Sequence, residues 1–467
     1  MKNSSAEIDP RYEAIRLLRE IDEKEVFAQD LLSEKCSSVN LSKRDKSLLT
    51  TLVNGVIRQR QSLDTIISFF SRISLHKIEP WILIALRLGI YQIIYLDKIP
   101  ASAAINTSVG LVKKLVCRTD AVRFTNAILR SAERSIQNKS FPEAEIVDPR
   151  HALYRGKDTW CLFHHAIFPD PQKQPISSLA ANYSHPEWLI KRWITRHGRE
   201  KTVEMCKADN SIPKVFLRVN NKKISNQEFM TLLEKEGIHS HSVNGALAVN
   251  ATPISEIPGF AEGLFFVQDI SAMKVAQFLR LEKTHRVLDM CAAPGGKATH
   301  MAELLESSGR IYALDVSFKR LQLLRENCLR MGVHNIFTVC GDASDDKVPF
   351  QDKFDRVLAD VPCSNTGVFS RRVEARWRLT EAGIEKMSVL QYSILKTGST
   401  LLKNSGYLVY STCSIEPEEN QDLVRRFLKN NSRFCLDREE FSFPSILGGN
   451  GGYIARICVK PEMKAMH

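Results

Sequence analysis

The sequence predicts a multidomain protein in which an all-α helical bundle is followed by a small α+β module and then by a Rossmann-like α/β domain. The length of 467 residues is too great for one ordinary core and suggests about three domains. Apolar residues recur at helical spacing throughout residues 11–135, whereas short apolar runs alternate with helical patterns between residues 286 and 410. These observations set the order of the domains.

Helical periodicity defines the first domain, which we place at residues 1–138. Pro80 stands where a helix over residues 81–96 would begin, and proline is favoured at that position. The pattern is also clear in a run of apolar residues that share one helical face: Leu48, Leu49, Leu52, Val53 and Val56.

The middle of the chain carries weaker patterns. From residue 139 to residue 181 the periodicity fades and prolines are frequent, so we predict a linker or an insertion. Residues 182–268 alternate helical patterns with strand patterns, such as the one at Val215–Val219, and this alternation predicts the small α/β module. The remaining residues, 269–467, form the predicted Rossmann-like domain.

Composition is that of a soluble globular protein. Hydrophobic residues make up 43% of the chain and charged residues 25%. The longest apolar stretches are far shorter than a membrane span, and the first residues lack the apolar segment of a secretory signal. Eleven cysteines without a framework spacing fit a reducing compartment. We therefore expect a cytoplasmic protein, and we expect it to be a monomer.

The sequence predicts no metal site. No Cys-x-x-Cys pair occurs in the chain. Two adjacent histidines, His164 and His165, would point in different directions on any regular element, which does not suit joint ligation of one ion.

The net charge of +12 favours a polyanionic partner, and half of this excess lies in the first 135 residues. Two consecutive helical patterns there are rich in basic residues. Lys113, Lys114 and Arg123 are our candidates for nucleic-acid contact in this region. A solvated basic face is the alternative interpretation.

Two cysteines carry the clearest chemical signal. Cys363 follows the apolar run 354–359, and Cys413 follows the run 406–410, so both thiols should emerge at the same edge of one sheet. Each could instead be a small buried residue, as free cysteine often is. Their positions just past the ends of strands favour a chemical role.

A thiol beside a carboxyl group suits methylation of cytosine at C5. The C5 carbon becomes nucleophilic only after a soft nucleophile adds to C6, and a thiolate is the side chain suited to that step. An acid must then hold N3 as charge arrives there. Asp360, in the same turn as Cys363, is the candidate, provided that it can donate a proton.

A glycine-containing turn lies between a predicted strand at 286–289 and a predicted helix at 298–305. Small residues let the backbone approach a ligand closely, and the helix N-terminus offers unpaired amides. The spacing is not that of the dinucleotide fingerprint, so neither a nicotinamide nor a flavin is predicted. The residues of the turn are Cys291, Ala292, Ala293, Pro294, Gly295, Gly296 and Lys297.

Four carboxylates stand at the ends of four predicted strands: Asp289, Asp315, Asp342 and Asp360. Singly, each could be a cap or turn residue. Together they indicate a nucleoside-bearing donor that lies across the carboxyl ends of a parallel sheet, with Asp315 placed for ribose hydroxyls and Asp342 for an adenine amino group. S-adenosylmethionine fits, because its sulfonium would point toward the two cysteine strands.

These motifs resemble those of the RNA cytosine-C5 methyltransferases, and within them the Sun (Fmu) branch of ribosomal small-subunit enzymes. The matching stretches are 289–297, 360–364 and 410–420. The first domain is similar to the RNA-binding antitermination factor NusB, for example at 86–89 and 124–130. The resemblance implies a class I methyltransferase domain, an RRM-like small module, and 16S ribosomal RNA, free or in an early small-subunit particle, as the substrate.

By this resemblance Cys413 is the nucleophile, while Cys363 assists removal of the C5 proton and release of the enzyme. Asp360 contacts the cytosine, and residues 291–297 with Asp315, Asp342 and Asp360 hold the methyl donor. The chain departs from the family pattern at Val361, Asn365, Val373–Ala375 and Gly452. None of these departures removes a reacting group.

A basic segment after Cys363 suits phosphate contact and stacking on an unpaired base. Its position close to Asp360 in sequence favours RNA, and a basic surface helix is the alternative. The target cytosine must be flipped or single-stranded, since a duplex would hide C6. The candidate residues of the segment are Arg371, Arg372, Arg376, Trp377 and Arg378.

Two alternatives stay open. The substrate could be transfer RNA, although the NusB-like segment favours ribosomal RNA. The protein could also be a non-catalytic RNA-binding or antitermination protein with a vestigial methyltransferase module, although the intact cysteines, Asp360 and glycine turn argue against this.

Overall fold

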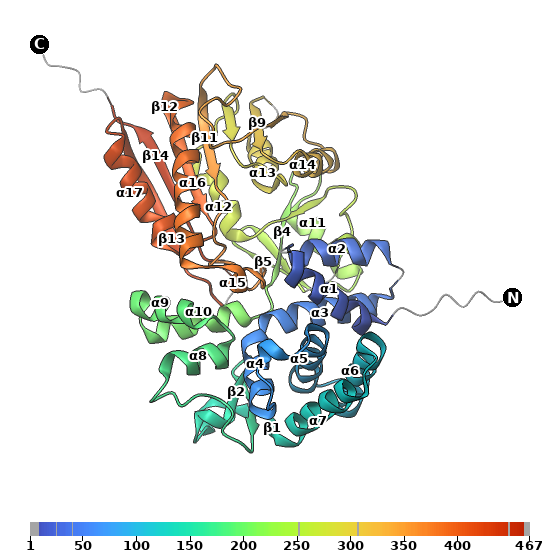
Figure 1. Cartoon of the computed structure of the whole chain (residues 1–467). Helices are drawn as coiled ribbons and strands as arrows, with labels where there is room; N and C mark the ends of the chain where they lie inside the picture. Colours follow the sequence, from blue (N-terminus) through green and yellow to red (C-terminus); the bar gives the residue numbers. More distant parts are fainter. Residues whose placement is uncertain are drawn as a thin grey trace, which may run out of the picture. The chain divides into compact units, whose positions relative to one another are not determined.

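A computed structural model describes residues 9–461, except 25, 40, 251–252, 306–307 and 447–448. The chain forms two compact units, whose elements are labelled in Figure 1. Unit 1 comprises Met1–Ile212 and Phe369–Arg378, and unit 2 comprises Pro213–Val368 and Leu379–His467. The chain therefore leaves unit 2 after Val368, runs through unit 1 over Phe369–Arg378, and returns. We call Phe369–Arg378 the crossing segment.

Unit 1 begins with the helices that the sequence predicts. In chain order they are α1 (Pro10–Lys24), α2 (Ala28–Ser38), α3 (Lys43–Arg58), α4 (Arg60–Phe70), α5 (Pro80–Tyr95), α6 (Ala101–Val116) and α7 (Thr119–Ser135). Helix α5 is buried on nearly every side, which explains its almost uniformly apolar sequence. Ser42 caps α3 and Pro80 opens α5, so local residue choice sets where these helices begin. None of the helices in the described ranges has the length and apolar character needed to cross a membrane.

Where we predicted a linker or an insertion, the structure has a three-stranded antiparallel sheet in the order β1-β3-β2. The strands are β1 (Ile136–Pro142), β2 (Ala152–Gly156) and β3 (Thr159–Phe163). Leu153, Cys161 and Phe163 are buried in the core of unit 1. The three strands are short and β1 is largely exposed, so their apolar periodicity was too weak to indicate a sheet.

Three more helices follow in unit 1, namely α8 (Pro175–Tyr183), α9 (Glu187–His197) and α10 (Arg199–Asn210). Helices α9 and α10, which the sequence analysis includes in the small α/β module, belong to compact unit 1. Trp193 of α9 is fully buried, next to Phe369 of the crossing segment. The crossing segment itself ends in a short helix, α15 (Ala375–Arg378).

Unit 2 opens with a four-stranded antiparallel sheet in the order β5-β6-β4-β7, in agreement with the predicted small α/β module. Its elements are β4 (Val215–Val219), α11 (Asn226–Lys235), β5 (Ser240–Val243), β6 (Ala246–Val249) and β7 (Phe265–Val267). Leu217 of β4 packs with Phe229 of α11 in a core of its own. Ser225 and Glu228 form a capping box that starts α11.

The rest of unit 2 is built on a seven-stranded sheet in the order β10-β9-β8-β11-β12-β14-β13. The first five strands in this order are parallel, and β14 and β13 are antiparallel to their neighbours. The strands are β8 (Arg286–Asp289), β9 (Arg310–Asp315), β10 (Ile336–Cys340), β11 (Phe354–Asp360), β12 (Leu402–Thr412), β13 (Phe434–Ser442) and β14 (Gly452–Val459). The predicted α/β domain with a parallel sheet is thus confirmed.

Helices cover both faces of the large sheet. Successive side chains of a strand point to opposite faces, so Leu408 and Tyr410 enter one core while Val409 enters the other. Residues of α16 (Glu381–Thr400) and α17 (Gln421–Asn430) complete the first core. Residues of α12 (Ile270–Phe278), α13 (Gly296–Leu304) and α14 (Phe318–Met331) complete the second.

Strand β8 is the point at which the strand order reverses. Strands β9 and β10 extend the sheet on one side of β8, and β11 and β12 extend it on the other. Ligands of open α/β sheets bind outside the carboxyl ends of the strands at such a point. Asp289 ends β8 and Asp360 ends β11, so these two carboxyl groups lie where a ligand is expected to bind.

Candidate active site

Cys363 and Cys413 lie side by side at the carboxyl ends of two neighbouring parallel strands. Strand β11 pairs with β12 so that Asp360 lies opposite Ser411, and each cysteine follows its strand within a few residues. The two Sγ atoms are 3.0 Å apart. The structure thus brings together two thiols that are far apart in the sequence.

The two thiols differ in accessibility, and the pKa of Cys363 is shifted by its surroundings. Cys363 is 9% exposed, whereas Cys413 is only partly buried. The hydrogen bond with Cys413 and burial raise the pKa of Cys363 well above its ordinary value. Cys363 is therefore a protonated thiol at neutral pH, and Cys413 is the sulfur that an incoming base reaches more easily.

Asp360 is bound from two sides. Lys297 Nζ donates to Asp360 Oδ2 over 2.6 Å, and Ser411 Oγ donates to Asp360 Oδ1 over 2.7 Å. Burial alone would lower the pKa of Lys297, but the charge of Asp360 and their hydrogen bond outweigh it and raise this pKa. Asp360 thus accepts two hydrogen bonds, one of them from the ammonium group of Lys297, and its donation of a proton to a bound base stays a prediction.

Asp289 is a buried carboxyl group at the end of β8. It has no exposed surface, and neither of its oxygens has a side-chain hydrogen-bond partner among the described residues, although the nearby backbone of Cys291 favours its charged form. Burial, followed by the nearby charge of Asp360, raises its pKa to about 8. Buried polar groups are nearly always paired, so this position fits a ligand with N–H or O–H donors, such as the amino group or hydroxyls of S-adenosylmethionine.

The glycine turn after β8 is held in one shape by its neighbours. Gly295 has φ +104°, a conformation that favours glycine, and a side chain there would meet Leu324 at 2.9 Å. Asp315, at the end of β9, accepts from the main-chain nitrogen of Ala293 over 3.1 Å and lies 3.5 Å from Arg320. Asp315 therefore braces the turn, in addition to any contact with a donor.

Asp342 follows β10 and is exposed. Hydrogen bonds from the side chain and the main chain of Ser344 lower the pKa of Asp342, so it is an ionised carboxylate. Both bonds end on Oδ1, and an exposed carboxylate oxygen can accept an amino group. The predicted contact of Asp342 with an adenine amino group stays a prediction.

Arg218 of the small sheet supports the first turn of α13, which sequence reasoning did not anticipate. Its guanidinium is 5% exposed and donates to the main-chain oxygen of Gly296 over 2.7 Å and to Thr299 Oγ1 over 2.9 Å. It also pairs with Glu303 at 3.0 Å. An arginine in an otherwise apolar strand was the signal that could have indicated this role. The small sheet thus fixes the helix that begins at the glycine turn.

Glu419 joins the residues that follow the two cysteines, and sequence reasoning assigned it no role. Its carboxyl group accepts from the main-chain nitrogen of Ser364 over 2.9 Å and from Gln391 Nε2 over 2.8 Å. The hydroxyls of Ser364 and Ser414 both donate to its second oxygen. Glu419 is completely buried, and burial raises its pKa. One side chain therefore binds the turns that follow both cysteines.

The predicted RNA-binding residues of the crossing segment lie within unit 1. Arg376 is completely buried and donates to the main-chain oxygens of Ser184 and Asp209 and to Asn210 Oδ1, at 2.9 to 3.1 Å. A guanidinium with no exposed surface cannot contact a phosphate in this structure, so the prediction for Arg376 is corrected.

The neighbours of Arg376 are also engaged with unit 1. Trp377 Nε1 donates to the main-chain oxygen of Ile57 over 2.7 Å, and Arg378 donates to those of Ile21 and Val26. Arg371 and Arg372 are half-buried. RNA contact by these four residues stays a prediction, whereas their attachment to unit 1 is what the structure shows.

The basic residues predicted in the first domain are placed differently. Lys113 and Lys114 are exposed on α6, and Arg123 is exposed on α7. Lys114 Nζ lies 4.2 Å from the centre of the Tyr12 ring. These residues are accessible to a polyanion, and RNA contact by them stays a prediction.

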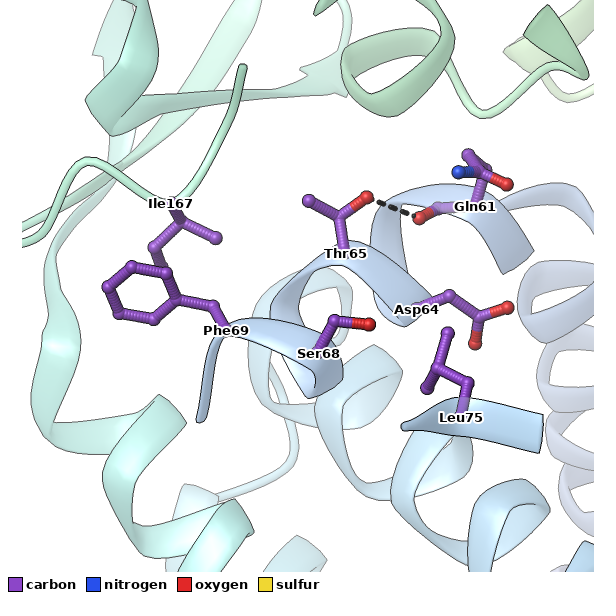
Figure 2. Close-up of a pocket in the computed structure, with 7 residues that line it drawn as sticks. All are labelled: Gln61, Asp64, Thr65, Ser68, Phe69, Leu75 and Ile167. Carbon is purple, nitrogen blue, oxygen red and sulfur yellow. Dashed lines mark hydrogen bonds between the residues drawn. The ribbon is translucent and has the colours of Figure 1, made fainter. Parts of the chain in front are cut away.

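Unit 1 contains a pocket of about 400 Å³ next to α4 (Figure 2). Thr65 Oγ1 donates to the main-chain oxygen of Gln61 over 2.9 Å at its wall, and Phe69 and Ile167 add apolar surface. Asp64 is bound by the Arg87 guanidinium at 2.7 and 2.8 Å. Because its one lining carboxylate is already paired and it holds no thiol, we assign it no chemistry. In the described part of the chain, no three His, Cys, Asp or Glu side chains are grouped as ligands of a metal ion.

Comparison with protein families gives three matches that together span most of the chain. Residues 276–464 match the family described as 16S rRNA methyltransferase RsmB/F. Residues 9–134 match the NusB family, and residues 185–251 match the ferredoxin-like domain of RsmF/B-like methyltransferases. The resemblances inferred from the sequence motifs are thus confirmed for the first domain and for the Rossmann-like domain.

Individual proteins of similar sequence or fold agree with these matches. The probable ribosomal RNA small subunit methyltransferase B of Synechocystis is 33% identical over 443 residues, which are 94% of this chain and 93% of that protein. The crystal structure of PH0851 has a TM-score of 0.75 at 24% identity and covers 97% of this chain and 99% of that one. NSun6 from Pyrococcus horikoshii, solved with SFG, has a TM-score of 0.54 at 22% identity and covers 59% of this chain and 98% of that one. At these identities the two structures show the fold alone.

Proposed function

The chain belongs to the 16S rRNA methyltransferase RsmB/F family, and we propose that it transfers a methyl group from S-adenosylmethionine to C5 of a cytosine in 16S ribosomal RNA. The observation that carries this proposal is the pair of thiols 3.0 Å apart, at the edge of the sheet where Lys297 of the glycine turn binds Asp360. The proposed nucleophile, the Lys297–Asp360 ion pair and the glycine turn that would hold the methyl donor therefore lie at the same edge of the sheet.

The residues of the crevice suit S-adenosylmethionine, which when bound supplies a methyl group on a positively charged sulfur. Asp289 offers a buried carboxyl group that no described side chain binds, and Asp315 and Asp342 offer carboxylates at the ends of the next two strands. The first turn of α13 offers main-chain amides. Support also comes from NSun6, a protein of the same fold that was solved with SFG.

We assign the covalent step to Cys413. The target cytosine leaves its stack, and the Cys413 thiolate adds to C6, which raises the electron density at C5. Negative charge then accumulates near N3. We place the Lys297–Asp360 pair beside N3, where the positive charge of Lys297 offsets the negative charge that develops.

We assign removal of the C5 proton to Cys363, directly or through a water molecule. Cys363 first gives its own proton to solvent water, and its raised pKa makes the resulting thiolate a strong base that takes the proton from C5. After the C5 proton has left, the bond between C6 and Cys413 breaks and the methylated base is released. Glu419 keeps the two turns in place throughout, because it binds Ser364 and Ser414 together.

Bisulfite sequencing of RNA from a strain that lacks this protein tests the proposal. We expect one cytosine of 16S ribosomal RNA to lose its 5-methyl group, and the methyl group to return when the intact gene is restored. Loss of the mark from transfer RNA instead would change the substrate. Loss from neither RNA pool, together with no binding of S-adenosylmethionine in calorimetry, would support a non-catalytic RNA-binding protein.

A further inference from the structure

Asn365 makes a second contact with Cys413. It lies two residues beyond Cys363, and its Oδ1 is 3.2 Å from Cys413 Sγ. Its Nδ2 donates to the main-chain oxygen of Cys363 over 3.0 Å. One amide group thus touches the backbone of one cysteine and the sulfur of the other.

The hydrogen bonds of this amide determine which sulfur carries which proton. The main-chain oxygen of Cys363 can only accept, so Nδ2 must face it and Oδ1 must face Cys413. An amide oxygen can also only accept, so the Cys413 thiol is the donor and is protonated. The proton between the two sulfurs therefore belongs to Cys363, which donates to Cys413.

The backbone conformation of the turn after Cys363 allows the Asn365 amide to contact Cys413. Asn365 has φ +62°, a left-handed conformation that asparagine tolerates better than most other residues. Two residues later, the main-chain nitrogen of Gly367 donates to the main-chain oxygen of Cys413 over 2.9 Å. The turn after Cys363 therefore binds Cys413 at two points, one through a side chain and one through the backbone.

We propose that Asn365 is a positioning residue for the nucleophile: its amide oxygen holds the Cys413 thiol protonated and fixes the direction of Sγ, so that the thiolate forms only when substrate binding breaks this hydrogen bond. A hydrogen bond to the neutral form of a group disfavours its charged form. The resting thiol is thereby protected, because thiolates are the species that oxidants and alkylating agents attack. This inference rests on the proposed function, in which Cys413 attacks C6.

Alkylation of the RNA-free protein tests whether Asn365 protects the Cys413 thiol. Iodoacetamide labelling between pH 6 and 9 is followed at each cysteine by mass spectrometry. Asn365→Gly keeps the left-handed backbone and removes the amide, so Cys413 should react about three- to tenfold faster at pH 7. Asn365→Asp keeps an accepting oxygen and adds a negative charge, so Cys413 should react more slowly than in the wild type.

The control is Asn244→Gly, the same substitution at an exposed asparagine with φ +49° in the turn between β5 and β6. It should leave labelling of Cys413 unchanged. Wild-type labelling in Asn365→Gly, or faster labelling in Asn365→Asp, overturns the protective role.

Turnover tests the positioning part and separates it from the proposed function. We expect Asn365→Gly to lower kcat about tenfold without changing KM for RNA, because the sulfur is no longer aimed at C6. Simple loosening of the fold would lower the melting temperature and speed labelling of buried cysteines such as Cys161 and Cys206, whereas loss of the Asn365 amide should speed labelling of Cys413 alone. An unchanged kcat overturns the positioning role. Absence of a cysteine-RNA adduct in every variant, with labelling as expected, overturns the covalent mechanism and leaves the hydrogen-bond role of Asn365 standing.

Discussion

Lys297 Nζ lies 2.6 Å from Asp360 Oδ2, and this ion pair joins the glycine turn after β8 to the end of β11. Both side chains are less than one third exposed. The pair therefore links the part of the crevice that suits the methyl donor with the strand that leads to Cys363. The positive charge of Lys297 in this pair can stabilise negative charge that develops on a ligand bound beside Asp360.

We expect Lys297→Met to lower kcat about 100-fold, because a preorganised charge beside the reacting base is lost. Lys297→Arg, which keeps a positive charge, should retain more activity than Lys297→Met. Lys403→Met is the matched control, since Lys403 pairs with Asp355 over 2.8 Å at the opposite end of the same strand. Single-turnover methyl transfer measures the effect, and equal losses in the variants at Lys297 and Lys403 would contradict the assigned role.

The two cysteine variants should behave in opposite ways. Cys413→Ala removes the nucleophile and should abolish both turnover and covalent attachment to RNA. Cys363→Ala removes the proton acceptor and should leave the protein attached to RNA. Denaturing gels of each variant with substrate RNA and S-adenosylmethionine detect the adduct. If the adduct accumulates in Cys413→Ala and is absent in Cys363→Ala, the roles of the two cysteines are exchanged.

Asp289 should make the stability of the donor-free protein depend on pH. Its pKa is about 8 in the folded protein and 3.8 as its ordinary value, so between these values the folded state holds a proton that the unfolded chain has lost. Stability therefore falls as pH rises toward 8 and is constant above it with respect to this group. Thermal melting of Asp289→Asn should show a gain over the wild type that grows from pH 5 to pH 8. A gain independent of pH would contradict the assignment.

Arg376→Met should destabilise unit 1 by about 2 to 4 kcal/mol, because the main-chain oxygens of Ser184 and Asp209 lose a buried charged donor. Burial lowers the pKa of Arg376 to about 10, so the side chain is charged at neutral pH. Hydrogen exchange of unit 1 peptides measures the effect separately from unit 2. Arg425→Met, at a side chain that is 73% exposed on α17, is the control and should leave exchange unchanged.

Lys113, Lys114 and Arg123 are predicted to contribute to RNA affinity through phosphate contacts. Replacing all three with alanine should reduce the dependence of log Kd on log salt concentration by about 0.7 per lost contact with single-stranded RNA. Fluorescence anisotropy over a range of salt concentrations gives this slope. Lys429→Ala, at an exposed position of α17, is the control. An unchanged slope in the triple variant would leave these residues as a solvated basic face.

The elements of unit 2 could be predicted from the sequence because their signals are local. The sequence predicts β8 with its observed bounds, and β11 with its apolar run and final aspartate. The glycine turn and both cysteine turns also follow strands directly, so their position at one sheet edge came from topology rules. The three strands β1 to β3 could not be predicted in this way, because few of their residues alternate cleanly between buried and exposed.

The partners of polar side chains could not be predicted. Arg376 lies in a basic stretch that is compatible with a surface helix, but distant segments of unit 1 surround it completely. Glu419 is one of three glutamates in a short stretch, and only packing shows that it binds the turns that follow both cysteines. Asn365 looked like a departure from a family pattern, and the fold turns its amide onto Cys413.

The sequence by itself determined which elements form and which reactive groups stand at the ends of the strands, because apolar periodicity and turn residues act over a few neighbouring positions. Tertiary structure decided which of these groups touch. Hydrogen bonds between side chains act over about 3 Å, so the pairing of Cys363 with Cys413, of Lys297 with Asp360 and of Asn365 with Cys413 exists only once the strands have packed into one sheet.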